Sequence, residues 1–172
     1  MFLNKIKDFW TKKIVKKRLS NVKLINSDSL IKKVGVVFDE SYFYERKELI
    51  KKLTQQGIHE NEIEILVFKN KIKKNEKYDY PVFSYKDLSW IAQVDGQEFK
   101  NFTATNFDLL ISYYDVEKAP LLLTTYLSKA SFKVGFASID KRLHHFMIDT
   151  NAENYEVFME ELFKYLKILN KL

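Results

Sequence analysis

The stretch that decides the fold lies in the second half of the chain, where residues 107–114 are Phe-Asp-Leu-Leu-Ile-Ser-Tyr-Tyr. Six of these eight residues are apolar, which predicts a central strand of a parallel sheet. A leucine-rich segment with helical character follows over residues 118–130, with Pro120 in its first turn. Residues 132–137, Phe-Lys-Val-Gly-Phe-Ala, predict the next strand. Strand, helix and strand in this order predict a βα unit of a parallel sheet.

The same alternation of strands and helices continues on both sides of this unit. It predicts a single three-layer α/β domain over residues 34–172, with a mostly parallel sheet of five to six strands, flavodoxin-like or half-Rossmann in type. Residues 88–106 fit either a short helix or an extended excursion. Further strands are predicted at 34–38, 63–68, 81–85 and 144–149, and further helices at 44–56 and 151–172. The last helix has an apolar stripe of Tyr155, Phe158, Met159, Leu162, Phe163, Leu166 and Leu169.

The positive charge of the chain is concentrated at its N-terminus. The 172 residues carry a net charge of +6, but residues 1–33 alone hold ten basic and two acidic side chains, a net charge of +8. The rest of the chain carries −2. This asymmetry predicts a basic N-terminal arm over residues 1–33, attached to a slightly acidic domain. The absence of cysteine excludes a disulfide framework and a thiolate nucleophile.

The arm begins with an amphipathic pattern. Its apolar side chains fall within about 140° of one another on a helical projection, although Lys13 and Lys17 intrude on the stripe. This pattern fits a helix that docks on the domain through the stripe. It also fits a helix that lies on an anionic bilayer, with phenylalanine and tryptophan among the headgroups. The stripe consists of Phe2, Leu3, Ile6, Phe9, Trp10 and Ile14.

The basic side chains of the arm indicate a third kind of partner, RNA or a ribonucleoprotein such as the ribosome. Lysine and arginine bind the phosphate backbone with a gain from counterion release, and such contacts carry no sequence information. We therefore expect no sequence-specific readout of DNA. The candidate residues for RNA or another anionic surface are Lys5, Lys12, Lys13, Lys16, Lys17, Arg18 and Lys23.

A ligand crevice is expected where the strand order reverses, outside the carboxyl ends of the first and fourth strands. Two carboxylates that face one crevice can perform acid–base chemistry or hold a divalent cation. As helix caps and turn residues, the same side chains would have a structural role only. The candidate residues are Asp39, Glu40, Ser41, Ser112, Tyr114 and Asp115.

The first strand lacks the glycine-rich turn that usually cradles phosphate. Residues 38–43 are Phe-Asp-Glu-Ser-Tyr-Phe, a segment without glycine whose two acids would repel phosphate. His144 and His145 are neighbours on a predicted strand, so their side chains would point to opposite faces and would not share a metal. We expect no metal site, no cofactor and no assignable catalytic residues.

Residues 107–149 are FDLLISYYDVEKAPLLLTTYLSKASFKVGFASIDKRLHHFMID. This segment resembles the later part of the N-terminal Rossmann-like domain of heptosyltransferase-type glycosyltransferases. In that family a second Rossmann domain holds most of the sugar nucleotide, so the resemblance implies the fold. The chain also looks like a small uncharacterised α/β family of Bacteroidota, whose AT-rich genomes suit its lysine-, asparagine- and isoleucine-rich composition.

These features favour a non-catalytic binding protein whose arm contacts RNA or a ribonucleoprotein. One alternative is a glycosyltransferase-like enzyme, or a remnant of one, that uses the crevice. Another is a protein attached to the inner face of the membrane. We expect a cytoplasmic location, because lysines interrupt every apolar stretch of the N-terminus and no segment has the length of a membrane span.

Overall fold

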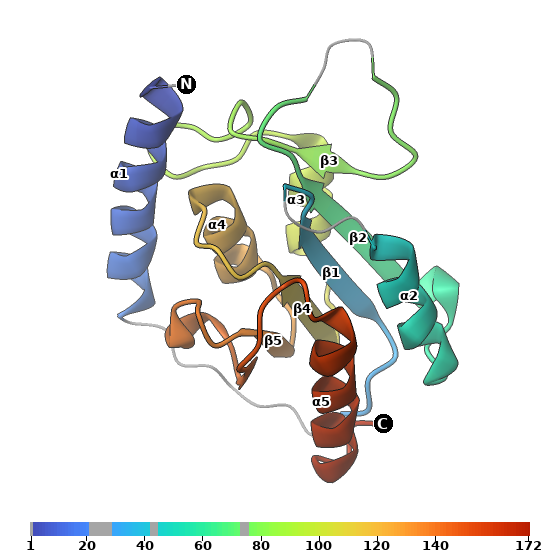
Figure 1. Ribbon diagram of the computed structural model, residues 1–172. Coiled ribbons are helices and arrows are strands. Elements are labelled where there is room, and N and C mark those ends of the chain that lie inside the picture. The colour runs from blue at the N-terminus through green and yellow to red at the C-terminus, as the bar shows by residue number, and fades with distance from the viewer. Residues whose placement is uncertain (1, 21–28, 42–44, 73–75) are drawn as a thin grey trace.

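The computed structural model describes residues 2–20, 29–41, 45–72 and 76–172. In these segments the strands of one parallel sheet are interspersed with five α-helices along the chain (Figure 1). The strands are β1 Val34–Asp39, β2 Ile63–Phe68, β3 Val82–Phe83, β4 Leu109–Tyr113, β5 Phe132–Phe136 and β6 Phe146–Ile148. The α-helices are α1 Phe2–Leu19, α2 Arg46–Gln55, α3 Gln97–Ala104, α4 Ala119–Leu127 and α5 Tyr155–Ile168. Short 3-10 helices span Glu60–Glu62 and Lys141–Leu143.

The six strands lie in the order β3-β2-β1-β4-β5-β6, and every neighbouring pair is parallel. The chain starts in the middle of the sheet, builds outward to β3, and then returns to β4 beside β1. This is the strand order of the doubly wound Rossmann fold, in which ligands bind near the point of reversal. The predicted three-layer α/β fold is confirmed, and its strand order is the Rossmann one rather than that of flavodoxin.

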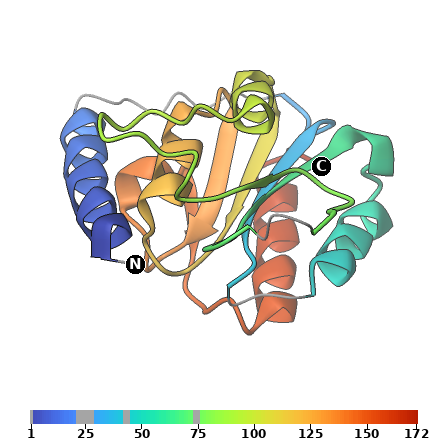
Figure 2. The same ribbon diagram turned by 90° about the horizontal axis from the view of Figure 1, so that it is seen from above.

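The helices divide between the two faces of the sheet. α2 and α5 cover one face and contact each other, while α3 and α4 cover the other (Figures 1 and 2). Right-handed crossovers impose this division, because the direction of chain progress reverses between β3 and β4. α1 lies outside the second layer, where it packs on α4. Among the described residues, no helix is long and apolar enough to cross a membrane.

The core is built on the two central strands. Every residue of β1 and β4 is buried, as predicted for the central strands of the sheet. Gly35 allows the Phe107 ring to lie against β1, because a Cβ at this position would stand 2.8 Å from two ring carbons. The predicted stripe of α5 is also largely confirmed, although Leu169 is 46% exposed. Its buried members are Phe158, Met159, Leu162, Phe163 and Leu166.

The edges of the sheet are shorter than the sequence predicts. β3 has two residues and β6 has three, and each pairs on one side only. Such edge strands gain ladder hydrogen bonds from a single neighbour, so apolar character alone does not extend them. Residues 88–106 contain both expected conformations, since α3 follows a short loop closed by an isolated bridge between Leu88 and Val94.

Candidate functional site

α1 docks on the domain through a face that periodicity did not single out. Thr11, Val15 and Leu19 are the buried residues of this face, and Val15 and Leu19 belong to the main hydrophobic core. Asp8 lies one turn before them. Its carboxylate accepts hydrogen bonds from the backbone N–H of Ala119 at 2.7 Å and from the Tyr85 hydroxyl at 2.8 Å. Asp8 therefore binds the first residue of α4 and fixes α1 at that end.

Other polar contacts hold α1 along its length. The Lys16 ammonium pairs with Glu117 at 2.7 Å, and the Lys16 carbonyl accepts a hydrogen bond from Arg142. Lys12 pairs with Asp8 at 2.7 Å, and Lys7 donates to the Leu88 carbonyl. Lys12 and Lys16 were expected to bind RNA or an anionic surface, but here they pair with acids of the protein itself.

The docking interpretation of the apolar stripe is wrong for three of its residues, which are exposed to solvent. Leu3, Phe9 and Trp10 are 65%, 62% and 51% exposed. Ile6 and Ile14 are half-buried, and the Phe2 side chain lies outside the description. The helix turns the other way because Asp8 satisfies an orphan amide of α4 and Val15 enters the core. The four-residue spacing of Thr11, Val15 and Leu19 is the signal that could have revealed this face.

A loop beside α1 exposes two further large apolar side chains, Trp90 and Ile91, which are 52% and 62% exposed. The loop is tight, because the Ser89 N–H donates to the Gln93 carbonyl at 2.7 Å and the Gln93 N–H to the Ser89 hydroxyl at 3.0 Å. The Lys7 ammonium stands 5.7 Å from the Trp90 ring centre. In Figure 2 this yellow-green loop reaches α1.

We name Leu3, Phe9, Trp10, Trp90 and Ile91 the aromatic surface. It contains both tryptophans of the protein. Trp90 and Ile91 were missed in the sequence, because they lie in the stretch whose conformation was ambiguous. Exposed lysines surround the α1 part of this surface, and the Lys13 ammonium lies 5.5 Å from the Trp10 ring centre. Those lysines are Lys5, Lys13 and Lys17, with Arg18 also exposed; Lys23 lies outside the described residues.

The predicted crevice is assembled only in part. Asp39, at the end of β1, is 2% exposed, and its carboxylate pairs with the Lys118 ammonium at 2.7 Å. Lys118 also donates to the Ser41 hydroxyl at 3.0 Å, and so does the side-chain amide of Asn70 at 2.8 Å. Two of the candidates, Asp39 and Ser41, therefore belong to one group of polar side chains at the carboxyl edge of the sheet.

Glu40 is the third candidate at this edge, and it is held by side chains from the segment after β2. Its carboxylate pairs with Lys69 at 2.5 Å and accepts a hydrogen bond from Tyr80 at 2.9 Å. The guanidinium of Arg46 lies over the Tyr80 ring, 3.6 Å from its centre. Asp39 and Glu40, which were expected to repel phosphate, are thus each paired with a lysine.

The three candidates in and after β4 have partners other than the Asp39 group. The hydroxyls of Ser112 and Tyr114 are buried beneath α4, where they contact the Thr125 hydroxyl at 2.9 Å and 2.6 Å. The Asp115 carboxylate accepts a hydrogen bond from the backbone N–H of Ala152 at 2.9 Å. Asp39 and Asp115 therefore have separate structural partners, and the described residues include no group of three or more His, Asp or Glu that could hold a metal ion.

A polar cluster lies in the core beneath α4. The Lys133 ammonium donates to the Thr125 carbonyl at 2.7 Å, and burial lowers its pKa to about 8. His144 is buried against Gly135, where a Cβ would stand 2.4 Å from the imidazole Nε2. Burial, with a smaller effect of the Lys133 charge, lowers the pKa of His144 to about 3. The imidazole is therefore neutral in the folded protein.

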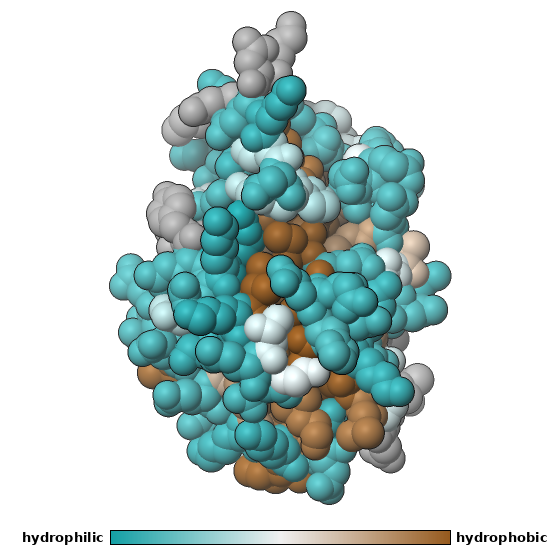
Figure 3. Space-filling model, turned by 90° about the vertical axis from the view of Figure 1, so that its right-hand side faces the viewer, coloured by the Kyte–Doolittle hydropathy of each residue, from teal (hydrophilic) through white to brown (hydrophobic). Residues whose placement is uncertain are grey.

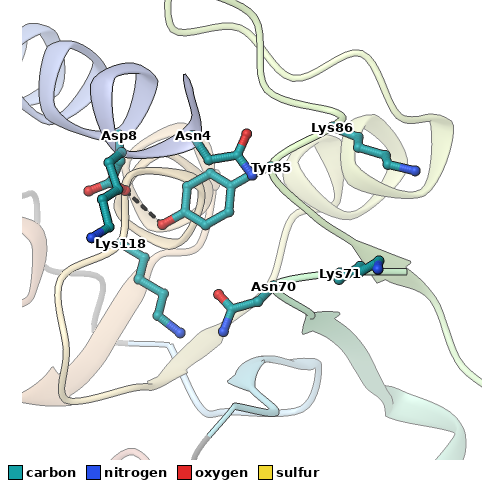
Figure 4. A pocket seen from close by; sticks show the side chains of 8 residues that line it. Asn4, Asp8, Asn70, Lys71, Tyr85, Lys86 and Lys118 are labelled. Carbon is teal, nitrogen blue, oxygen red and sulfur yellow. Dashed lines mark hydrogen bonds between the residues drawn. The ribbon is translucent and has the colours of Figure 1, made fainter. Parts of the chain in front are cut away.

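A cavity with a volume of about 960 Å³ opens between α1 and the carboxyl edge of the sheet (Figure 4). Residues of α1 form one wall, and the segments that follow β2 and β3 form the other. Lys118 points toward Asn70 below the Asp8–Tyr85 hydrogen bond. The lining consists of Asn4, Lys5, Asp8, Asn70, Lys71, Tyr85, Lys86 and Lys118.

The strand order and the position of this cavity define a doubly wound α/β protein of the Rossmann type. The chain belongs to the family described as "Family of unknown function (DUF6913)", whose model matches residues 7–169. No curated protein matches the chain, and no solved structure does. The resemblance of residues 107–149 to heptosyltransferase-type glycosyltransferases and the Bacteroidota origin stay predictions.

Proposed function

We propose that this protein is a non-catalytic binding protein that attaches reversibly to an anionic membrane surface, on its cytoplasmic face, through the aromatic surface. The observation that carries this proposal is the orientation of α1. The helix is fixed by Asp8, Val15 and Leu19, and it leaves Phe9 and Trp10 directed outward among lysines. The Trp90–Ile91 loop adds a second, independently built part of the same surface.

The composition of the aromatic surface favours lipid over RNA. Aromatic rings serve both partners, because they stack on bases and also sit among lipid headgroups. Leu3 and Ile91 discriminate between the two, since aliphatic side chains gain from entering an acyl boundary and have no ring on which a base can stack. Lys5, Lys13 and Lys17 add attraction to anionic headgroups. The pairing of Lys12 and Lys16 with acids of the protein leaves fewer cations to follow an RNA backbone.

The expected strength is that of a peripheral contact. Partial burial of five large apolar side chains contributes roughly 1 kcal/mol each, and each lysine near an anionic surface adds about 1 kcal/mol. Ordering of the side chains and lost freedom of the whole protein oppose these gains. Binding is therefore reversible and decreases with salt, because the screening length shortens.

The opposite side of the molecule provides a control surface. In Figure 3, which shows the side that faces away from α1, the surface is mostly hydrophilic, and hydrophobic residues gather in a central hollow and near the lower edge. At the C-terminal end of α5, Ile168 and the following Leu169 are 63% and 46% exposed. α5 carries three acids and two lysines, whereas α1 carries seven basic side chains and one acid. We therefore expect α5 not to bind anionic lipid.

Flotation with vesicles tests the proposal. The full-length protein should float with vesicles rich in phosphatidylserine and stay at the bottom with phosphatidylcholine alone. Trp10→Ala/Trp90→Ala should lose flotation, and Ile168→Ser/Leu169→Ser should keep it. Equal flotation of the tryptophan variant and the wild type overturns the proposal. Retention on RNA without flotation, lost in Lys13→Gln/Lys17→Gln but kept in Leu3→Ala/Ile91→Ala, overturns it in favour of RNA.

The enzyme interpretation needs two carboxylates that face one crevice. Asp39 is buried against Lys118, and Asp115 accepts a backbone hydrogen bond from Ala152. Each carboxylate has an identified structural partner, so the crevice supplies no pair for acid–base chemistry. This separation supports a binding role over a catalytic one.

A further inference from the structure

We infer that the cavity between α1 and the carboxyl edge of the sheet binds a phosphate-bearing organic anion. This site is separate from the aromatic surface, and the inference does not depend on membrane attachment. The cavity lies where the doubly wound order reverses, since Asp39 ends β1 and Lys118 follows the neighbouring strand β4. Open parallel sheets bind their ligands at this position.

The charge of the lining is positive. Lys5 lies on α1, Lys71 follows β2, and Lys86 follows β3, so three exposed lysines from three separate segments line the cavity. The one acid of the lining, Asp8, is already engaged by Lys12, by Tyr85 and by the backbone N–H of Ala119. The charge of the Asp8 carboxylate is therefore balanced by Lys12 within the protein. The charges of Lys5, Lys71 and Lys86 remain to attract an anion.

The acids beneath the cavity do not cancel this charge. Asp39 is paired with Lys118 at 2.7 Å and Glu40 with Lys69 at 2.5 Å, so each carboxylate has a cation of its own. A shallower hollow formed by Glu40, Ser41 and Lys69 adjoins the cavity and shares Asn70 and Lys71 with it. The paired acids position their lysines, and the lysines outside these pairs set the charge that a ligand meets.

A neutral hydrogen-bond donor, the side-chain amide of Asn70, also lines the cavity. Asn70 donates one N–H to the Ser41 hydroxyl at 2.8 Å, and a side-chain amide carries a second N–H. Together with lysine ammonium groups, this is a donor set for phosphoryl oxygens, which form short charge-assisted hydrogen bonds. Recognition here uses side chains instead of a glycine-rich backbone cradle, and this explains why the usual phosphate motifs are missing from the sequence.

The size of the cavity indicates more than a bare phosphate. About 960 Å³ is at the upper end of the range of small-molecule sites, roughly 300–1,000 Å³. The Tyr85 ring provides an apolar wall. Such a ligand is a phosphate monoester or diphosphate with an organic part. It comes either from solution or from a lipid headgroup, because Asn4 and Lys5 bring α1, and with it the aromatic surface, to the rim of the cavity.

Calorimetric titration of the full-length protein with inorganic pyrophosphate tests the site without any membrane. We expect saturable binding that weakens about tenfold in Lys71→Gln/Lys86→Gln, which corresponds to about 1.4 kcal/mol. Both lysines are exposed, so the variant should fold as the wild type does. Lys164→Gln/Lys167→Gln on α5 removes the same charge elsewhere and should leave binding unchanged. Absence of saturable binding, or equal loss in the two variants, overturns the inference.

A second arm separates the two sources of the ligand. Vesicles that contain phosphatidic acid, whose phosphate is a monoester, are compared with phosphatidylserine vesicles of equal charge. A preference for phosphatidic acid that disappears in Lys71→Gln/Lys86→Gln assigns the site to a lipid headgroup. Pyrophosphate binding without that preference assigns it to a soluble ligand. Failure of flotation alone rejects the proposed membrane function and leaves the site intact, since the calorimetric arm contains no lipid.

Discussion

α1 and α5 are the two terminal helices of the chain, and periodicity gives each of them an apolar stripe. The stripe of α5 is buried, with Phe158 and Leu162 fully inaccessible to solvent. The stripe of α1 is turned outward, and Phe9 and Trp10 are more than half exposed. Two similar sequence patterns thus differ in burial: the stripe is covered in α5 and exposed in α1.

The comparison shows that periodicity finds an apolar face but does not say what covers it. α5 follows β6 directly, so its stripe returns to the open face of the sheet and packs beside α2. α1 meets a sheet face that α4 already covers, and it is held there by Asp8 and a narrow row that ends at Leu19. Lys13 and Lys17 interrupt its stripe, and their charges would be costly to bury.

The largest expected difference between the two helices is in folding stability. Phe158→Ala should lower the free energy of unfolding by about 5 kcal/mol, because it empties a site where the ring contacts Tyr113 and Phe136. Phe9→Ala on α1 should change it by less than about 0.5 kcal/mol. Urea denaturation followed by circular dichroism measures both values. Equal costs would mean that the α1 stripe is buried in solution.

Acid pH is expected to destabilise the core through His144. The pKa of His144 is lowered to about 3 in the folded protein, so the unfolded chain binds more protons below its ordinary value of 6.5. The contribution of the neutral His144 to folding stability should be fully present above about pH 6.5. The free energy of unfolding should fall by about 3 kcal/mol on acidification to about pH 4.5. Denaturation at a series of pH values measures this dependence.

Two variants isolate the histidine contribution to the acid dependence. His144→Asn removes the titrating group and should flatten the curve between about pH 6.5 and about pH 4.5. His59→Gln, at an exposed position outside the core, should leave the curve unchanged. A His144→Asn protein that still loses stability as steeply as the wild type would contradict the assignment. Lys133, whose lowered pKa of about 8 lies outside this window, does not contribute to it.

The Asp8 contact is the point where α1 can be released without a change to the aromatic surface. Asp8→Ala removes an acceptor from the Ala119 N–H and from Tyr85, so it should cost about 2 kcal/mol. Asp8→Asn keeps an acceptor oxygen and should cost less. Limited trypsin digestion provides a local readout, because released lysines of α1 should be cleaved faster. Unchanged cleavage in Asp8→Ala would show that Val15 and Leu19 are sufficient for docking.

The smallest expected effect on stability comes from the aliphatic part of the aromatic surface. Leu3→Ala/Ile91→Ala should shift the free energy of unfolding by less than about 0.5 kcal/mol, because both side chains are already exposed. The same variant should weaken binding to anionic vesicles about tenfold, as roughly 1.4 kcal/mol of apolar burial is lost. Vesicle titration by tryptophan fluorescence measures the change. Unaltered binding would remove the argument that favours lipid over RNA.

Much of the fold could be predicted because the buried strands of a sheet have short runs of mostly apolar residues. Residues 34–38 are apolar without interruption, residues 107–114 are apolar except for Asp108 and Ser112, and these runs contain most of β1 and all of β4. The edge strands are less well defined, since Val82 and Phe83 alone form β3. The site was predictable only in part: Asp39 and Ser41 lie together, but Ser112 and Tyr114 turn beneath α4, because alternation along a strand fixes a face and not the helix that covers it.

The sequence by itself determined the α/β class, the central strands, the α5 stripe and the concentration of positive charge before Val34. These properties depend on neighbours along the chain, so local patterns express them. Only the tertiary structure decided which face of α1 looks outward, that Trp90 lies beside this helix, and that Lys5, Lys71 and Lys86 line one cavity. Those outcomes depend on contacts between residues far apart in sequence, such as that of Asp8 with Ala119, which no local pattern contains.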